Sequence, residues 1–173
     1  MSQTEEYQTN QYLTFTLDRE VFALSIDSVR EVLELTDITR IPRTPEFMRG
    51  VINLRGHAVP VVDLRRKFRM RVAEDTVNTC IIIVEVTFEG ERTIMGALAD
   101  SVREVVELDA GEIEAAPKMG TAVRTEFIKG MGKQNEQFII ILDVDKVFSV
   151  EELALIQGGA GEADDLGASR SAA

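Results

Sequence analysis

Residues 27–35 read Asp-Ser-Val-Arg-Glu-Val-Leu-Glu-Leu, and residues 100–108 read Asp-Ser-Val-Arg-Glu-Val-Val-Glu-Leu. The two stretches differ at a single position. The similarity continues downstream, where the following residues recur at a constant offset of 80: Phe47, Gly50, Asp63 and Phe68 as Phe127, Gly130, Asp143 and Phe148. A repeat of about 75 residues has the size of a small domain, so we interpret the chain as a duplicated module. We call matched positions of the two copies twins.

The duplication predicts how the 173 residues are organised. We expect a flexible arm over 1–10, a first β-barrel over 11–72, a second β-barrel over 76–148, a C-terminal helix over 149–157 and a disordered tail over 158–173. A module of roughly 65 to 70 residues is marginally stable alone because it buries only about 60% of its surface. The two barrels are therefore expected to pack together and share buried surface.

Alternating apolar and polar residues predict short strands throughout both copies. Residues 12–17 and 21–26 alternate on either side of a polar turn, and 50–54 and 58–62 form a second pair, so each pair predicts a hairpin. Many short strands at regular spacing indicate an all-β protein of two five-stranded closed barrels, because closure removes exposed strand edges. Pro60 lies inside the second hairpin, where we expect it at a position that needs no backbone donor.

The repeated stretch and the residues after the second hairpin predict short helices. Asp27 is a plausible helix N-cap, yet the residues that follow it also alternate as in a strand. We expect each copy of the stretch to form one helical turn that runs into a strand. Asp63 precedes Leu-Arg-Arg-Lys-Phe and is expected to begin a short helix.

Residue types needed for catalysis or metal binding are scarce. Cys80 is the one cysteine, which excludes an internal disulfide, and its apolar surroundings predict a buried strand residue. His57 is the one histidine, so a multi-histidine metal site is excluded, and its position in a hairpin turn is more typical of a surface residue than of a base. Residues 130–133 lack the full spacing of a phosphate-binding loop. We expect no enzyme activity, no cofactor and no bound metal.

Targeting and membrane-spanning segments are not visible in the sequence. The first residues do not resemble a signal peptide, and no apolar run approaches the about 18 residues that cross a bilayer. We expect a cytoplasmic protein without direct membrane insertion.

Basic residues concentrate in one segment. Residues 40–71 hold nine basic and two acidic residues, a net charge of +7, within a chain whose net charge is −11. These side chains either pair with acidic residues of the same fold or form a docking surface for an acidic or helical protein, and both interpretations remain open. Nucleic acid is disfavoured as a partner because the acidic remainder repels phosphates and the segment lacks interleaved aromatic residues.

The two copies differ at the tip of one predicted hairpin. Residues 53–56 read Asn-Leu-Arg-Gly, whereas their twins at 133–136 read Lys-Gln-Asn-Glu, so Arg55 is matched by Asn135. Positions kept in both copies are expected to serve the fold, and positions that differ are where specialisation is expected. Arg55 is either ordinary turn chemistry or a recognition contact held by a rigid barrel.

Three motifs carry a resemblance to a known family: Ile41-Pro42 through Pro45, Asn53-Leu54-Arg55-Gly56, and Pro60-Val61-Val62-Asp63-Leu64-Arg65. Together they resemble the signature of the CheW family of chemotaxis coupling proteins, over about residues 11–157. The resemblance implies two pseudo-symmetric SH3-like barrels and a non-catalytic adaptor that couples the cytoplasmic tip of chemoreceptors to the histidine kinase CheA. It also implies recruitment to membrane-bound receptor arrays.

The same motif matching implies a receptor-binding site. In the family the receptor docks in a groove between the barrels, and the matching positions here are Arg55, Val29, Glu31, Val32 and Gly50. The kinase's regulatory domain shares the fold and pairs barrel to barrel with the adaptor, through residues that the motif does not assign. Two alternatives remain: a coupling protein of a chemosensory pathway that controls pili or gene expression, and, less favoured, a small-ligand enzyme on a duplicated barrel.

Overall fold

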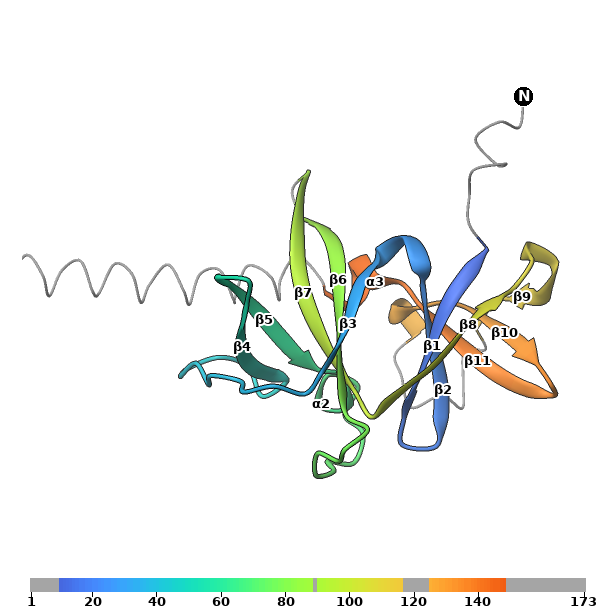
Figure 1. Ribbon diagram of the computed structural model, residues 1–173. Coiled ribbons are helices and arrows are strands. Elements are labelled where there is room, and N and C mark those ends of the chain that lie inside the picture. The colour runs from blue at the N-terminus through green and yellow to red at the C-terminus, as the bar shows by residue number, and fades with distance from the viewer. Residues whose placement is uncertain (1–9, 89, 117–124, 149–173) are drawn as a thin grey trace, which may run out of the picture.

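The computed structural model describes residues 10–88, 90–116 and 125–148. In these ranges the chain forms strands joined by turns and by helices of about one turn (Figure 1). The expected C-terminal helix over 149–157, the tail over 158–173 and residues 1–9 of the arm lie outside the described residues.

The strands form two sheets. One has six strands in the order β8-β1-β2-β11-β10-β9, and the other has five in the order β3-β6-β7-β5-β4. The six-stranded sheet consists of β1 (Gln11–Leu17), β2 (Glu20–Ser25), β8 (Ser101–Glu107), β9 (Ile113–Glu114), β10 (Ile128–Gln134) and β11 (Gln137–Leu142). The five-stranded sheet consists of β3 (Val29–Glu34), β4 (Met48–Leu54), β5 (His57–Asp63), β6 (Cys80–Phe88) and β7 (Glu91–Ala99). The prediction of an all-β fold is confirmed, and the two-residue β9 is the strand beyond the predicted five.

Each sheet combines strands from both copies of the repeat. The β1–β2 hairpin pairs with β8 and β11, and the β6–β7 hairpin pairs with β3 and β5 in the same antiparallel and parallel senses. The first hairpin of each copy therefore completes the sheet of the other copy. The contiguous division into 11–72 and 76–148 expected from the sequence does not describe this pairing, because the hairpins are exchanged.

Each sheet is partly closed by the segment that follows one of its end strands, because this segment pairs with a strand at the other end of the sheet. After β3 the chain crosses to pair Thr39 with Val51 of β4. After β8 it passes through η2 (Ala110–Glu112) to form β9, which pairs with β10. Twin glycines permit these close approaches. A Cβ on Gly50 would lie 2.2 Å from the carbonyl oxygen of Thr39, and one on Gly130 would lie 2.6 Å from Cγ2 of Ile113. Neither position accepts a side chain without displacement of its neighbour, so these glycines serve the barrel-like closure.

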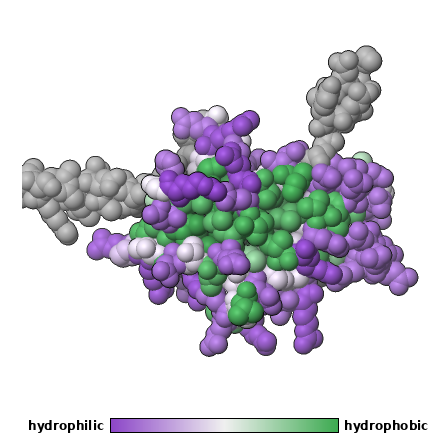
Figure 2. Space-filling view, viewed as in Figure 1, coloured by the Kyte–Doolittle hydropathy of each residue, from purple (hydrophilic) through white to green (hydrophobic). Residues whose placement is uncertain are grey.

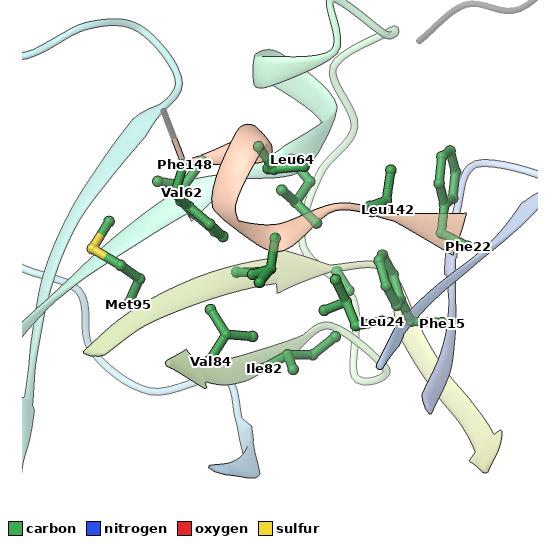
Figure 3. Close-up of a cluster of buried hydrophobic side chains, with 14 of the residues drawn as sticks. Phe15, Phe22, Leu24, Val62, Leu64, Ile82, Val84, Met95, Leu142 and Phe148 are labelled. Atoms are coloured by element: carbon green, nitrogen blue, oxygen red, sulfur yellow. The ribbon is translucent and has the colours of Figure 1, made fainter. Parts of the chain in front are cut away.

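The apolar run in β6 reflects burial of both faces of that strand. Ile81 and Ile83 belong to the core of the five-stranded sheet, whereas Ile82 and Val84 belong to a larger cluster that lies between the two sheets (Figure 3). Because side chains alternate across a strand, a strand covered on both faces is apolar at every position. The two sheets thus share a buried core, as the duplication predicted.

Four phenylalanine rings cross this shared core. Phe15 and Phe22 of the β1–β2 hairpin are followed by Phe68, which ends α2 (Leu64–Lys67), and by Phe127 in η3 (Thr125–Phe127). Successive ring centroids are 5.9, 6.0 and 5.8 Å apart, within the range of favourable aromatic pairs. The rings connect residues of the first copy to the second copy.

Twin aspartates cap twin helices. The Asp63 carboxylate accepts hydrogen bonds from the backbone N–H of Arg65 and Arg66 at the start of α2, at 3.0 and 3.4 Å. The Asp143 carboxylate accepts one from the N–H of Asp145 in α3 (Val144–Val147), at 3.2 Å. The prediction that Asp63 begins a short helix is confirmed.

The repeated stretch differs between its copies. In the first, the helical turn η1 (Ile26–Ser28) runs into β3, as predicted. In the second, β8 begins directly at Ser101, so the predicted helical turn is wrong there. The reason lies at Asp100, whose carboxylate accepts hydrogen bonds from Nε of Arg65 at 2.8 Å and from the N–H of Asp18 at 2.6 Å. These bonds hold the start of β8 against α2 and the β1–β2 turn.

Candidate partner-binding site

Arg55 lies at the tip of the β4–β5 hairpin, in a two-residue turn. Its φ is 52° and that of Gly56 is 87°, close to the angles of a type I′ turn. The side-chain oxygen of Asn53 supports the turn by accepting a 2.8 Å hydrogen bond from the N–H of Gly56. Asn135, the twin of Arg55, has the same φ of 52°. Asparagine tolerates this left-handed backbone better than arginine does, so turn chemistry does not explain Arg55.

The Arg55 side chain reaches across to β3. Its Nη1 and Nη2 donate hydrogen bonds to the two carboxylate oxygens of Glu31 at 2.8 and 3.0 Å, a bidentate pair. The hydrogen bond from Arg55 holds the pKa of Glu31 below its ordinary value. The Arg55 side chain is nevertheless 70% exposed and that of Glu31 is 29% exposed. The pair orients the guanidinium while leaving it open to a partner.

Valines of the repeated stretch lie on β3 and on its twin strand β8. On β3 they lie on the face opposite to Glu31, because Val32 pairs with Ile82 of the shared core whereas Glu31 pairs with Ile83. Val32 is 40% exposed and its twin Val105 is 47% exposed, while Val29 and its twin Val102 pack against the shared core. Figure 2 shows hydrophobic residues gathered in a band across the middle of the face where β3 and β8 run in Figure 1. We call Val29, Val32, Val102 and Val105 the valine surface. Two of its valines belong to the five-stranded sheet, on β3, and two to the six-stranded sheet, on β8.

The expected site residues therefore separate into two groups. Arg55, Glu31, Val29 and Val32 lie on β3 or in direct contact with it. Gly50 is buried in β4 against Thr39, and its position explains the closure of the sheet. A direct contact between Gly50 and a partner does not follow from this placement.

Sequence reasoning missed Val105 and Val102 as candidates for the site. The signal that identifies them was present, because they are the twins of Val32 and Val29 in the repeated stretch. The missing element was the arrangement of the sheets, which brings both copies of the stretch to the same face.

Several arginines of the basic segment pair within the fold. Arg65 contacts Asp100, with its side chain only 12% exposed, and Arg49 lies 3.8 Å from Asp63 and contacts Asp75 as well. These pairs favour the interpretation that part of the positive charge neutralises acidic residues of the same chain.

The residues first considered for chemistry have ordinary surroundings. His57 is exposed at the start of β5. Cys80 begins β6 as predicted but is partly exposed instead of buried, and its Sγ donates to the carbonyl of Asn78 at 3.1 Å. Across the described ranges, no three His, Cys, Asp or Glu side chains are grouped to hold a metal ion. None of the helices described there is long and apolar enough to cross a membrane.

Comparisons with known proteins agree on one family. A family model described as the CheW-like domain matches residues 11–152. The chemotaxis protein CheW of Klebsiella aerogenes is 37% identical over 146 residues, which cover 84% of this chain and 86% of that protein. The chemotaxis protein CheW of Thermotoga maritima is 33% identical over 149 residues, covering 84% of this chain and 91% of that protein.

A solved structure shows the same fold. The scaffolding protein TtCheW of Thermoanaerobacter tengcongensis matches with a TM-score of 0.75 and 36% sequence identity. The match covers 83% of this chain and 90% of that one.

Proposed function

The chain belongs to the family of CheW-like domains, and on this premise we propose that it is a non-catalytic chemotaxis adaptor. In this role it couples the cytoplasmic tips of chemoreceptors to the histidine kinase CheA. Its relatives are named chemotaxis proteins, and the solved relative is named a scaffolding protein, which supports a function in assembly. The proposal places the protein in the cytoplasm, recruited to receptor arrays at the membrane.

The receptor contact is assigned to Arg55 and the valine surface. Exposed valines on β3 and β8 offer apolar area to a helical partner. Arg55, which Glu31 holds to the other face of β3, supplies an oriented, planar donor at this end strand of the sheet. An interface that combines exposed apolar residues with an oriented arginine concentrates its affinity in a few residues. Gly50 contributes to this site indirectly, by letting the chain after β3 close onto β4.

One observation carries the proposal: Arg55 occupies a backbone position better suited to its twin Asn135, and it is held extended by Glu31 instead of being buried. Strained backbone is enriched at functional sites, and because Arg43 and Arg69 also have positive φ, it is the bidentate contact with Glu31 that distinguishes Arg55. The coupling mechanism is binding alone, in which one molecule holds two partners through different surfaces.

The test is a titration of a receptor cytoplasmic-tip fragment with the wild type, Arg55→Ala and the matched control Asn135→Ala. We expect Arg55→Ala to weaken binding at least about tenfold and Asn135→Ala to leave it unchanged. Equal affinity of all three proteins would remove Arg55 from the site. The absence of receptor binding by the wild type would overturn the proposed function.

A further inference from the structure

An opening lies between the β4–β5 and β6–β7 hairpins of the five-stranded sheet. β5 and β7 pair in parallel only from Val61↔Gly96 to Asp63↔Leu98, and above that point the two hairpins diverge (Figure 1). A cavity of about 560 Å³ occupies the gap, a volume typical of binding sites. We call it the slot. Its lining includes residues 57–60 of β5 and residues 92–94 of β7. Ile83, which belongs to the core of the five-stranded sheet, also lines it.

Among the residues that the structure describes, the gap that forms the slot occurs between β5 and β7 of the five-stranded sheet and not between their twins β11 and β2. In the six-stranded sheet the equivalent strands β11 and β2 pair from Ile139↔Val21 onward, two residues earlier than their twins in the five-stranded sheet. One of the positions that differ between β5 and β11 is Pro60, whose twin is Ile140. Proline has no N–H to donate to β7, so the ladder stops below it and the strands separate. The twin of Ala58 is Phe138, so the first copy also has a small residue where the second has a large one.

Backbone groups on both walls of the slot point into it. In the β4–β5 hairpin the pair Leu54↔His57 flanks the turn, and successive residues direct their N–H and C=O groups alternately toward β4 and away from it. By this alternation Ala58 directs its backbone groups toward β7. The same alternation in the β6–β7 hairpin directs the backbone groups of Arg92 and Ile94 away from β6. The described pairing of β7 with β5 begins only at Gly96, so these groups of β7 face the slot. The slot is thus bordered by two open strand edges.

The rim of the slot is basic. Arg30, Arg55 and Arg92 line it together with His57 and the carboxylate of Glu31, which is paired with Arg55. Arg30 and Arg92 both contact the one carboxylate of Glu85, at 3.2 and 3.4 Å, so their two positive charges share one negative charge. Three arginines against the carboxylates of Glu31 and Glu85 leave one positive charge in excess, which favours an acidic ligand in a chain whose net charge is −11.

From these features we propose that the slot binds an extended acidic segment of a partner protein, which adds as a short strand between β5 and β7. Strand addition uses the open backbone edges for affinity, and alternate side chains of the segment reach the apolar floor and the arginine rim. The open part of β5, residues 57–60, accommodates about four residues of an extended chain. This proposal does not rest on the coupling function. Arg55 lies both in the rim of the slot and in the proposed receptor contact, so the variants that test the slot are placed at Ala58 and Arg92, outside that contact.

The test uses the full-length chain and a fluorescein-labelled peptide, acetyl-Glu-Val-Glu-Val-Glu-amide, followed by fluorescence anisotropy. We expect saturable binding to the wild type. Ala58→Phe introduces the twin's side chain into the slot and should weaken binding at least about tenfold, as should Arg92→Gln. Phe138→Ala and Arg19→Gln, the twin substitutions in the six-stranded sheet, should bind as wild type does.

A second peptide separates strand addition from simple charge attraction. Acetyl-Glu-Pro-Glu-Pro-Glu-amide keeps the charge but lacks the N–H groups of the valines, so it should bind at least about tenfold more weakly. Equal binding of the two peptides, or undiminished binding by both Ala58→Phe and Arg92→Gln, would overturn the proposal, as would no saturable binding by the wild type. Thermal melts of each variant show whether its fold is intact, and the exposed Arg92→Gln keeps the test valid if Ala58→Phe unfolds.

Discussion

Arg55 and Asn135 occupy the same turn with the same φ, and only the arginine reaches across to another strand. Replacement of Arg55 by its twin's residue, Arg55→Asn, is therefore expected to separate function from stability. The variant should melt at or above the wild-type temperature, because asparagine accepts the left-handed backbone more readily. Its affinity for a receptor-tip fragment should fall at least about tenfold. Thermal unfolding monitored by circular dichroism and the receptor titration provide the two measurements; a lower melting temperature would show that Arg55 is needed by the turn.

The ion pair between Glu31 and Arg55 gives the fold a small pH dependence. The pKa of Glu31 is lowered in the folded protein from its ordinary value of 4.5, so the pair stabilises the fold at neutral pH. This contribution is lost as the pH falls from 4.5 through the lowered pKa of the folded protein. Wild type should melt slightly above Glu31→Gln at pH 7, and the difference should shrink as the pH is lowered below 4.5 and in high salt. A difference that persists in acid would mean that Glu31 acts through packing and not through its charge.

Substitution of Gly50 tests whether its close approach to Thr39 is needed for closure of the five-stranded sheet. In Gly50→Ala the new methyl group meets the carbonyl oxygen of Thr39 at 2.2 Å on a backbone with φ of 147°, so unfolding free energy should fall by about 3 kcal/mol. Gly56→Ala is the matched control, because its φ is also positive but nothing lies within 4 Å of the added Cβ, and it should cost about 1 kcal/mol. Urea denaturation measures both, and equal losses would contradict the role assigned to Gly50.

At the scale of the elements, one residue sets how far two strands pair. Pro60→Ile copies the twin residue and restores a backbone N–H that can donate to β7. The amide of residue 60 should then exchange slowly with deuterium, and the slot should no longer bind the acidic peptide. Hydrogen exchange measured by NMR checks this directly. Fast exchange at residue 60 with retained peptide binding would show that Pro60 does not hold the strands apart.

The sequence predicted most elements because their causes are local. Alternation identified the β4–β5 hairpin, and an aspartate before a basic run identified the cap of α2. The sequence did not predict that the helical turn before β8 is missing, because the local structure there depends on a contact between Asp100 and Arg65, which is distant in the chain. It also placed Cys80 too deep, since the position of a residue at the start of a strand depends on the loop before it.

At the scale of the whole molecule, the exchanged hairpins make the two halves interdependent. The same repeat is compatible with two contiguous barrels or with exchanged ones, because a hairpin can be replaced in its sheet by its twin from the other copy. The sequence alone therefore could not distinguish them. This is also why the sequence indicated the first copy of the site, Val29 and Val32, but not the second, Val102 and Val105, on the same face.

The exchange predicts cooperative unfolding. Removal of the β1–β2 hairpin opens the six-stranded sheet, and the shared core then loses Phe15 and Phe22 from its center. Calorimetry should show one transition whose calorimetric and van't Hoff enthalpies agree. Two separate transitions would indicate that the halves fold independently and would contradict the exchanged arrangement.

The central claim is that this chain bridges a receptor and a kinase by binding alone, with Arg55 and the valine surface as the receptor contact. The most direct measurement is co-sedimentation of the kinase's regulatory domain with vesicles that display receptor cytoplasmic tips, in the presence and absence of this protein. The kinase domain should sediment with wild type and with Asn135→Ala, and should remain in solution with Arg55→Asn or without the protein. Sedimentation that is the same with and without the protein, or undiminished by Arg55→Asn, would contradict the claim.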